Sequence, residues 1–434
     1  MAPDAGGQNG SGGTSGGSDT GNAKSGSGGA SAGSSAMNTG GRTNDGGAVG
    51  EAGASASGGA FGEAGANTDG GTTADGGAVG EGGSDGASVV ERLYISRILG
   101  GVLAASLRTS DGAPSLLPGA AINPGGHATA IAVDHSQRFV FVADENKHID
   151  TYPIADDGTL PATPDSSVAT AETLITLALD AKGRFAYAGT QPGKAIYTFK
   201  IAPATGVLSA VGEPMPVGDA PDHSAPAFIA ADPSGRFVYV TLAGELGIRG
   251  YRVDQDSGAL TELDDSPFAK TDLPVGDLVF GGAMVFKPSG DFLYTVGGGL
   301  NVFSINDASG ALTLVDGSPF TLDVQSDPNA PNIAIDPQGR YLYATRFLLN
   351  NHISGFAIDD ASGKLEPVPG SPFTGASPYS IAVDPSGHFV FVGDDAPQIS
   401  VYSLSRANGA LTKLPDSPFM FGGLEPKLVF ATLP

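Results

Sequence analysis

Two histidines of this chain stand close to strand-like segments and could take part in acid–base chemistry. His127 lies in GGHATAIAVD, directly before an alternating apolar run, and His223 lies in DHSAPAFIAADPSG, slightly upstream of another. A histidine with carboxylates and an arginine nearby supplies the groups for general base catalysis and for stabilising an oxyanion. The fold must decide which of these groups meet.

The sequence holds no stronger catalytic or cofactor motif. It has no P-loop, no HExxH pair, no G-x-S-x-G elbow and no calcium-loop pattern. It has no cysteine, which excludes disulfides, thiolate metal sites and cysteine nucleophiles. Its six histidines are scattered without ligand spacing. We therefore expect neither a metal nor a cofactor.

One nine-residue stretch is written six times along the chain. DPSGRFVYV begins at Asp232, and near-copies begin at Asp134, Asp180, Lys287, Asp336 and Asp384. In each unit an alternating strand precedes the stretch, and two further strands joined by an S-G-A-L-like turn follow it. Four short antiparallel strands per unit, repeating about every 50 residues, predict an all-β propeller.

Each repeated turn has a structural explanation. The Asp can accept hydrogen bonds from its own downstream backbone, Pro presets φ, and Gly closes the turn. This role explains the repeated Asp residues better than a ring of catalytic or metal-binding carboxylates does. The aromatic residues that follow are predicted to fill the space between neighbouring blades. In the SPF segments at Ser266, Ser318, Ser371 and Ser417, we expect Phe to anchor the outer strand and Pro to stop further pairing.

The two ends of the repeated region complement each other. RLYISRILGGVLAASLRTSDGAPSLLPGA, from Arg92, matches the second to fourth strands of a unit, whereas EPKLVFATLP, from Glu425, matches a first strand. We predict that they form one composite blade, which removes the exposed sheet edges. The fold class expected is a seven-bladed propeller of four-stranded antiparallel blades over residues 89–434.

Geometry restricts where a site can form. The short turns share one face, so the second-to-third loops and the links between blades share the other and surround the channel mouth. His127, His223, Asn332, Tyr379 and Lys427 precede first strands in the sequence. From the second-to-third loops come further candidates: Glu145, Asn146, Glu245, Arg346 and Asp394.

Residues 1–88 form a segment of Gly, Ala, Ser, Asn, Asp and Thr that is predicted to be a disordered tether. Such a tether favours an extracellular, cell-surface or periplasmic protein, although MAPDAGGQNG does not read as a signal peptide and a cytoplasmic location stays open. No apolar run approaches the roughly 18 residues of a membrane span.

The net charge of −24 argues against nucleic-acid partners. A closed ring predicts a monomer.

The stretch IAVDPSGHFVFVGDDAPQISVYSLSRANGALTKLPDSPF, from Ile381, resembles a repeat of the lactonase-type propellers. These are the 6-phosphogluconolactonase-like proteins, which are related to YVTN-repeat surface propellers, and the resemblance covers residues 89–434. Enzymatic members carry a G-P-R-H-like segment before a first strand. The comparable segments here keep a histidine at His127 and at His223.

The resemblance implies hydrolysis of a sugar lactone of the 6-phosphogluconolactone type. His127 or His223 would activate water, and Arg346 or Lys427 would stabilise the oxyanion. Glu145, Asn146, Glu245, Asn332, Tyr379 and Asp394 would bind the substrate. The alternative is a non-catalytic secreted or cell-surface propeller that binds a protein or glycan through its variable loops.

Overall fold

The computed structural model describes residues 90–97, 101–108, 110–119, 121–191, 194–218, 226–242, 247–268, 282–296, 299–320, 332–346, 352–375, 378–394, 396–422 and 426–433. These residues form strands and turns and contain no α-helix. Within these ranges, therefore, no helix has the length and apolarity that crossing a membrane requires. The predicted tether, residues 1–88, lies outside the described residues.

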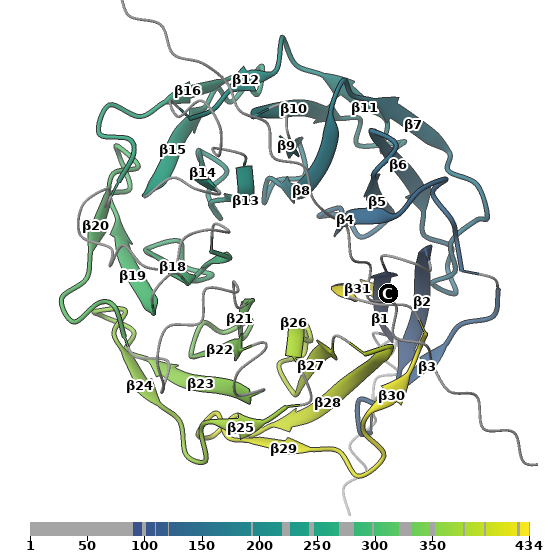
Figure 1. Ribbon diagram of the computed structural model, residues 1–434, viewed down its shortest axis with the longest axis vertical. Helices are drawn as coiled ribbons and strands as arrows, with labels where there is room; N and C mark the ends of the chain where they lie inside the picture. Colours follow the sequence, from purple (N-terminus) through teal and green to yellow (C-terminus); the bar gives the residue numbers. More distant parts are fainter. Residues whose placement is uncertain are drawn as a thin grey trace, which may run out of the picture. The chain divides into compact units, whose positions relative to one another are not determined.

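The strands form seven antiparallel sheets, numbered blades 1 to 7 in chain order, and the first strand of each blade lies nearest the centre of the ring (Figure 1). From the centre outward, blade 1 consists of β31 (Lys427–Leu433), β1 (Val90–Arg97), β2 (Gly101–Leu107) and β3 (Pro114–Leu116), and blade 2 consists of β4 (Ala128–Val133), β5 (Phe139–Asp144), β6 (His148–Pro153) and β7 (Ser166–Ala169). Blade 3 consists of β8 (Thr173–Leu179), β9 (Phe185–Gln191), β10 (Ala195–Ile201) and β11 (Leu208–Ala210), with β12 (Met215–Pro216) beside β10. Blade 4 consists of β13 (Pro226–Ala231), β14 (Phe237–Leu242), β15 (Ile248–Val253) and β16 (Leu260–Glu262).

Blades 5 to 7 repeat the same order. Blade 5 consists of β17 (Met284–Phe286), β18 (Phe292–Val296), β19 (Leu300–Ile305) and β20 (Leu312–Leu314). Blade 6 consists of β21 (Ile333–Ile335), β22 (Tyr341–Arg346), β23 (His352–Ile358) and β24 (Leu365–Pro367), with β25 (Phe373–Thr374) beside β23. Blade 7 consists of β26 (Pro378–Val383), β27 (Phe389–Asp394), β28 (Gln398–Leu404) and β29 (Leu411–Lys413), with β30 (Phe419–Met420) beside β28. The predicted seven-bladed propeller is confirmed.

The composite blade is also confirmed. The C-terminal strand β31 pairs antiparallel with β1, from Ser96 opposite Lys427 to Val90 opposite Leu433. Figure 1 shows β31 beside β1 at the centre of blade 1, where the two ends of the repeated region meet. Because β1 gains a partner on its inner side, the ring closes without leaving this edge free.

The repeated Asp has the turn role that the sequence predicts. Asp232 is 4% exposed, and its Oδ1 accepts hydrogen bonds from the backbone N–H groups of Arg236 and Phe237 at 2.7 Å each. Asp180 and Asp384 make the equivalent bonds in their own blades. The carboxylates satisfy backbone donors at the start of each second strand, so the turn and the strand are fixed together.

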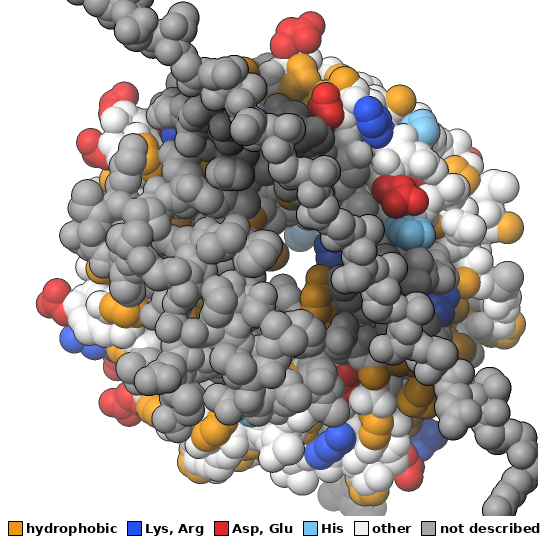
Figure 2. Space-filling model, in the orientation of Figure 1, with side chains coloured by type: hydrophobic (Ala, Val, Ile, Leu, Met, Phe, Trp, Pro, Cys, Tyr) orange, Lys and Arg blue, Asp and Glu red, His pale blue; other side chains and the backbone are white. Residues whose placement is uncertain are grey.

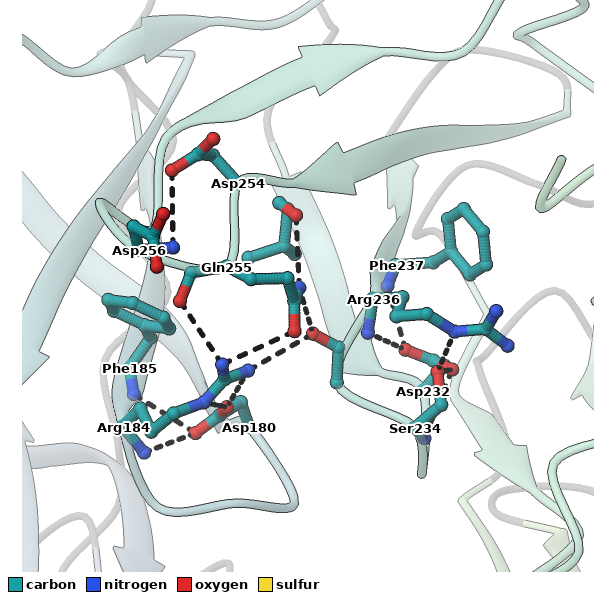
Figure 3. Close-up of polar contacts among 12 residues, drawn as sticks. Asp180, Arg184, Phe185, Asp232, Ser234, Arg236, Phe237, Asp254, Gln255 and Asp256 are labelled. Carbon is teal, nitrogen blue, oxygen red and sulfur yellow. Dashed lines mark hydrogen bonds and ion pairs between the residues drawn. The ribbon is translucent and has the colours of Figure 1, made fainter. Parts of the chain in front are cut away.

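The Arg that follows the turn joins neighbouring blades (Figure 3). Arg184 donates from Nε to Asp180 at 2.9 Å and from Nη1 to the backbone and side-chain oxygens of Gln255, both at 3.2 Å. Its guanidinium also lies 5.2 Å from the centroid of the Phe185 ring. Since Gln255 belongs to the turn between β15 and β16, one side chain connects blade 3 to blade 4.

Aromatic residues fill the seams between blades, as predicted. The ring of Phe185, in blade 3, packs against Gly258 in the outer turn of blade 4, where φ is +81° and an added Cβ would lie 2.5 Å from the ring. In blade 6, the Tyr343 hydroxyl donates to the carbonyl of Gly409 in blade 7 at 2.8 Å. An equivalent hydrogen bond joins the Tyr239 hydroxyl to the Gly310 carbonyl at 2.7 Å. These two seams therefore combine apolar burial with a buried hydrogen bond.

The prediction that Pro ends pairing in the SPF segments is wrong. Pairing resumes one residue later, because Phe268 and Ile248 exchange both backbone hydrogen bonds, at 2.8 and 3.0 Å. The Ser266 hydroxyl accepts the N–H of Gly250 at 3.2 Å and so takes the place of a strand carbonyl. The predicted anchoring is confirmed, since Phe268 is 6% exposed and packs in the seam between blades 4 and 5.

The two faces divide as predicted. On one face, the links between blades bond to the second-to-third loops, as in the bond from Thr170 N to the Lys147 carbonyl at 2.8 Å and from Phe421 N to the Pro397 carbonyl at 3.1 Å. On the other face, the inner turns contact the outer turns of the next blade, as Arg184 does. The channel mouth is the end of the ring that is surrounded by the links between blades and the second-to-third loops.

Candidate functional site

His127 and Glu145 meet at the channel mouth of blade 2. His127 directly precedes β4 and Glu145 directly follows β5, and Ala128 is paired with Asp144 in that hairpin. The backbone N–H of Glu145 donates to the His127 carbonyl at 3.1 Å. Their side chains face each other, with His127 Nδ1 3.4 Å from Glu145 Oε2, and they are 45% and 47% exposed. Both side chains are therefore about half exposed to solvent.

Asn146 and Lys427 each bond to a backbone carbonyl within two residues of His127. The Asn146 amide donates from Nδ2 to the carbonyl of Gly125 at 2.8 Å, which holds the loop before β4 against the loop after β5. Lys427, the first residue of β31, donates from Nζ to the carbonyl of Thr129 in β4. Ring closure therefore brings the side-chain ammonium group of Lys427, a residue near the C-terminus, to the strand that follows His127.

This arrangement is suited to general base chemistry. A carboxylate next to Nδ1 favours the tautomer with a proton on Nδ1, so that Nε2 of His127 is left as the basic nitrogen. An ammonium group nearby can stabilise negative charge that develops on a substrate oxygen. Figure 2 shows a small opening near the centre of the ring.

Two further predicted residues, Asn332 and Tyr379, meet at the seam of blades 6 and 7. Asn332 donates from Nδ2 to the backbone carbonyl of Tyr379 at 2.5 Å, and both residues are partly buried. The amide thus has a structural partner in the neighbouring blade.

Asp394 is not open to solvent. It ends β27 and is fully buried, and its Oδ2 accepts hydrogen bonds from Gln398 Nε2 at 3.0 Å and Ser400 Oγ at 2.9 Å. Burial raises the pKa of Asp394 to about 6, although the bonds from Ser400 and Gln398 oppose this. Its carboxylate therefore supports the turn between β27 and β28 in this conformation.

Three predicted residues cannot be placed in the same way. His223 and Glu245 lie outside the described residues. Arg346 is the last residue of β22, opposite His352, and only its backbone is described. Their proposed roles stay predictions.

A buried acidic pair lies behind Glu145 in blade 2. Asp144 and Asp150 are 1% and 5% exposed, and Asp144 Oδ1 accepts the N–H of His148 at 3.0 Å. Burial raises the pKa of Asp144 and the charge of Asp150 raises it further, while the His148 N–H lowers it. Among the described residues, Asp144 Oδ2 has no hydrogen-bond partner. These carboxylates add negative charge directly behind the mouth.

The described residues offer no ready-made metal site, because no three His, Asp or Glu side chains among them come together as ligands. A pocket of about 340 Å³ lies elsewhere, between the outer strands of blades 2 and 3, and is lined by residues that include Tyr197, Thr198 and Glu213.

The sequence indicated the contact between His127 and Glu145 only in part. The register next to the DHSQ turn would set position 127 opposite position 146, and an irregularity between Ala128 and Ala130 shifts it by one residue, so that position 127 faces position 145. The contact of Lys427 with Thr129 had no comparable local signal, because it joins residues from opposite ends of the propeller.

Known proteins resemble this chain over most of the propeller. A family model described as "Lactonase, 7-bladed beta-propeller" matches residues 162–275 and 220–420. The 6-phosphogluconolactonase of Yersinia pestis (strain Pestoides F) is 26% identical over 299 residues, which cover 68% of this chain and 85% of that protein. That of Cronobacter sakazakii is 27% identical over 278 residues, covering 53% of this chain and 80% of that protein.

Solved structures share the fold at lower identity. A putative 6-phosphogluconolactonase from Bacteroides fragilis is 19% identical with a TM-score of 0.65, covering 80% of this chain and 99% of that one. A periplasmic gluconolactonase from Pseudomonas aeruginosa is also 19% identical with a TM-score of 0.65, covering 80% of this chain and 100% of that one. At this level of identity the two structures establish the architecture alone.

Proposed function

This chain belongs to the lactonase family of seven-bladed β-propellers, and from that premise we propose that it hydrolyses a sugar lactone at its channel mouth. The observation that carries the proposal is the contact of 3.4 Å between His127 Nδ1 and Glu145 Oε2 at the open end of blade 2. The bond from Lys427 to Thr129 supports it, because it brings a cation to the same segment.

The reaction needs one base and one group that stabilises negative charge. His127 accepts a proton from water through Nε2 while Glu145 holds the imidazole through Nδ1. The resulting hydroxide adds to the lactone carbonyl carbon, and Lys427 stabilises the oxyanion of the tetrahedral intermediate. When the intermediate collapses, the bond from that carbon to the ring oxygen breaks, and the proton held by His127 passes to the ring oxygen. The product is the open-chain hydroxy acid.

The proposal is tested by lactone hydrolysis followed in a pH-stat, with the spontaneous rate subtracted. The substrates are glucono-1,5-lactone and its 6-phosphate ester. We expect His127→Ala combined with His223→Ala to lower kcat/KM by about 10²–10⁴-fold, the usual contribution of a general base. A wild-type rate no higher than that of the double variant refutes the proposal.

A matched control separates catalysis from folding. His135 is also an exposed histidine, but it lies in an inner turn on the opposite face, against Gly183. His135→Ala is expected to retain the wild-type rate. Equal losses in His135→Ala and in the double variant would show that the assay reports stability and not the proposed site.

We also propose a location outside the cytoplasm. The support is the Gly-rich composition of residues 1–88, together with the periplasmic description of the related gluconolactonase. Fractionation of cells of the native host, with immunodetection of the chain, tests it. Recovery in the cytoplasmic fraction alone would contradict it.

A further inference from the structure

The charges around the proposed site bear on which lactone it accepts. A phosphorylated sugar carries about −1.5 to −2 charges on its phosphate at neutral pH. Proteins usually hold such a group with Arg or Lys side chains or with the N-terminus of a helix. The described residues contain no helix, so a phosphate at this mouth would depend on side-chain cations.

The described cations near His127 are already engaged with backbone oxygens. Lys427 donates to the Thr129 carbonyl. Arg97, which ends β1 in the same blade as Lys427, is 8% exposed and donates from Nη1 to the Phe421 carbonyl at 2.8 Å. Lys147, two residues after Glu145, is exposed, but its Nζ donates to the Ala171 carbonyl at 2.8 Å. Each of these three cations therefore already has a backbone acceptor, with which a phosphate would have to compete.

Negative charge, in contrast, is concentrated here. Glu145 is 47% exposed beside His127, and the carboxylates of Asp144 and Asp150 are buried behind it. The Thr173 hydroxyl lies 3.5 Å from the Glu145 carbonyl, so the adjacent Glu172 belongs to the same edge of the mouth. A phosphate entering from this side would meet several carboxylates, together with cations that are already bonded to backbone carbonyls.

The rest of the chain adds to this field. Its formal net charge is −24, and red acidic side chains occur around the margin of the view in Figure 2. Long-range repulsion of a dianion therefore adds to the local effect.

We infer that the site accepts an uncharged sugar lactone in preference to a phosphorylated one. This inference rests on the proposed lactone hydrolysis and specifies its substrate class. It differs from the activity named for the 6-phosphogluconolactonases that the chain resembles in sequence. The acidic mouth acts by repelling the phosphate ester, while leaving the reacting carbonyl group of a neutral lactone unaffected.

The test compares kcat/KM of the full chain for glucono-1,5-lactone and for 6-phosphoglucono-1,5-lactone at several salt concentrations. We expect the neutral lactone to be favoured by about tenfold or more at 0.01 M salt, where the screening length is about 30 Å. Raising the salt should increase kcat/KM for the ester and leave that for the neutral lactone unchanged. Faster hydrolysis of the ester, or a preference that does not respond to salt, overturns the inference.

Charge variants distinguish a local effect from the charge of the whole protein. Glu172→Lys should raise kcat/KM for the ester about three- to tenfold and change that for the neutral lactone less than twofold. Glu366→Lys makes the same change of net charge on the exposed outer strand β24 and should leave both substrates unchanged. Equal effects of the two variants would contradict a local origin.

The outcomes also separate this inference from the proposed function. Hydrolysis of the ester in preference to the neutral lactone refutes the inference and leaves lactone hydrolysis intact. If neither lactone is hydrolysed, the proposed function fails, and calorimetric titration with gluconate and 6-phosphogluconate still tests the charge preference. Tighter binding of 6-phosphogluconate at low salt, or binding of neither compound, overturns the inference.

Discussion

Glu91 and Asp384 form an acidic contact at the seam where the ring closes, and replacing Glu91 with Gln should stabilise the propeller at neutral pH. Glu91 Oε1 accepts the N–H of Ser386 at 2.9 Å, and its carboxyl group is also hydrogen-bonded to Asp384, which is fully buried. The other ionisable groups at this contact are His388, 2.9 Å from Ser386 Oγ, and Arg92, which donates to the Glu91 carbonyl. Glutamine keeps the size of the side chain and can donate to Asp384 without a negative charge.

The size of the effect follows from the acidity of Glu91. Burial and the charge of Asp384 raise its pKa from the ordinary 4.5 to about 7. At about 1.4 kcal/mol per pH unit, this difference corresponds to about 3 kcal/mol, which screening of a partly exposed carboxyl reduces to about 1–2 kcal/mol. The folded protein holds the proton of Glu91 more tightly than the unfolded chain does. The contribution of this group to the free energy of unfolding is therefore fully present below pH 4.5 and is lost as the pH rises through 7.

The assay is chemical denaturation at pH 4.5, 6 and 8, with the free energy of unfolding compared between wild type and Glu91→Gln. We expect the variant to be more stable by about 1–2 kcal/mol at pH 8 and equal to wild type at pH 4.5. Glu213→Gln, at an exposed position on the outer rim, serves as the control and should show no such trend. A variant that is less stable at pH 8, or a difference that is constant with pH, refutes the reasoning.

Three further predictions concern the seams and the buried acid of blade 7. Tyr343→Phe removes the bond to the Gly409 carbonyl and should lower the free energy of unfolding by about 1–2 kcal/mol, measured by denaturant titration. Gly258→Ala should cost about 1–3 kcal/mol in the same assay, because its Cβ would meet the ring of Phe185 at a positive φ; an unchanged midpoint would contradict this. Asp394→Asn should raise stability above pH 6, where the buried carboxyl loses its proton, and have little effect below pH 4; a loss at pH 8 equal to that at pH 4 would contradict it.

The fold was predictable because its cause is local and repeated. The DPSG-type turn specifies its own hydrogen bonds through Asp232 and its equivalents, so each blade carries the information for its inner hairpin. Ring closure could also be predicted from the sequence. The fragment from Arg92 lacks the first strand of a unit, and the C-terminal fragment matches a first strand alone. The role of Pro267 was misjudged because Ser266 replaces the missing strand partner with its hydroxyl, which pattern reasoning does not reveal.

The candidate site was only partly predictable, since it depends on contacts between units. His127, Glu145 and Lys427 were each expected at the channel mouth, but their mutual arrangement depends on hairpin register and on ring closure. Asp394 was expected to bind substrate and is instead buried, because Gln398 and Ser400 lie within its own hairpin and draw the carboxylate inward. Loop composition alone contains no information about that choice.

A crystal structure of the chain with bound D-gluconate tests the central claim most directly. The account predicts the carboxylate of gluconate within hydrogen-bond distance of His127 Nε2 and Lys427 Nζ, with its hydroxyl groups toward the channel. Gluconate bound elsewhere, for example in the outer pocket beside Tyr197, would contradict it. The absence of gluconate from the channel mouth would also contradict it, provided that protein from the dissolved crystals hydrolyses the lactone.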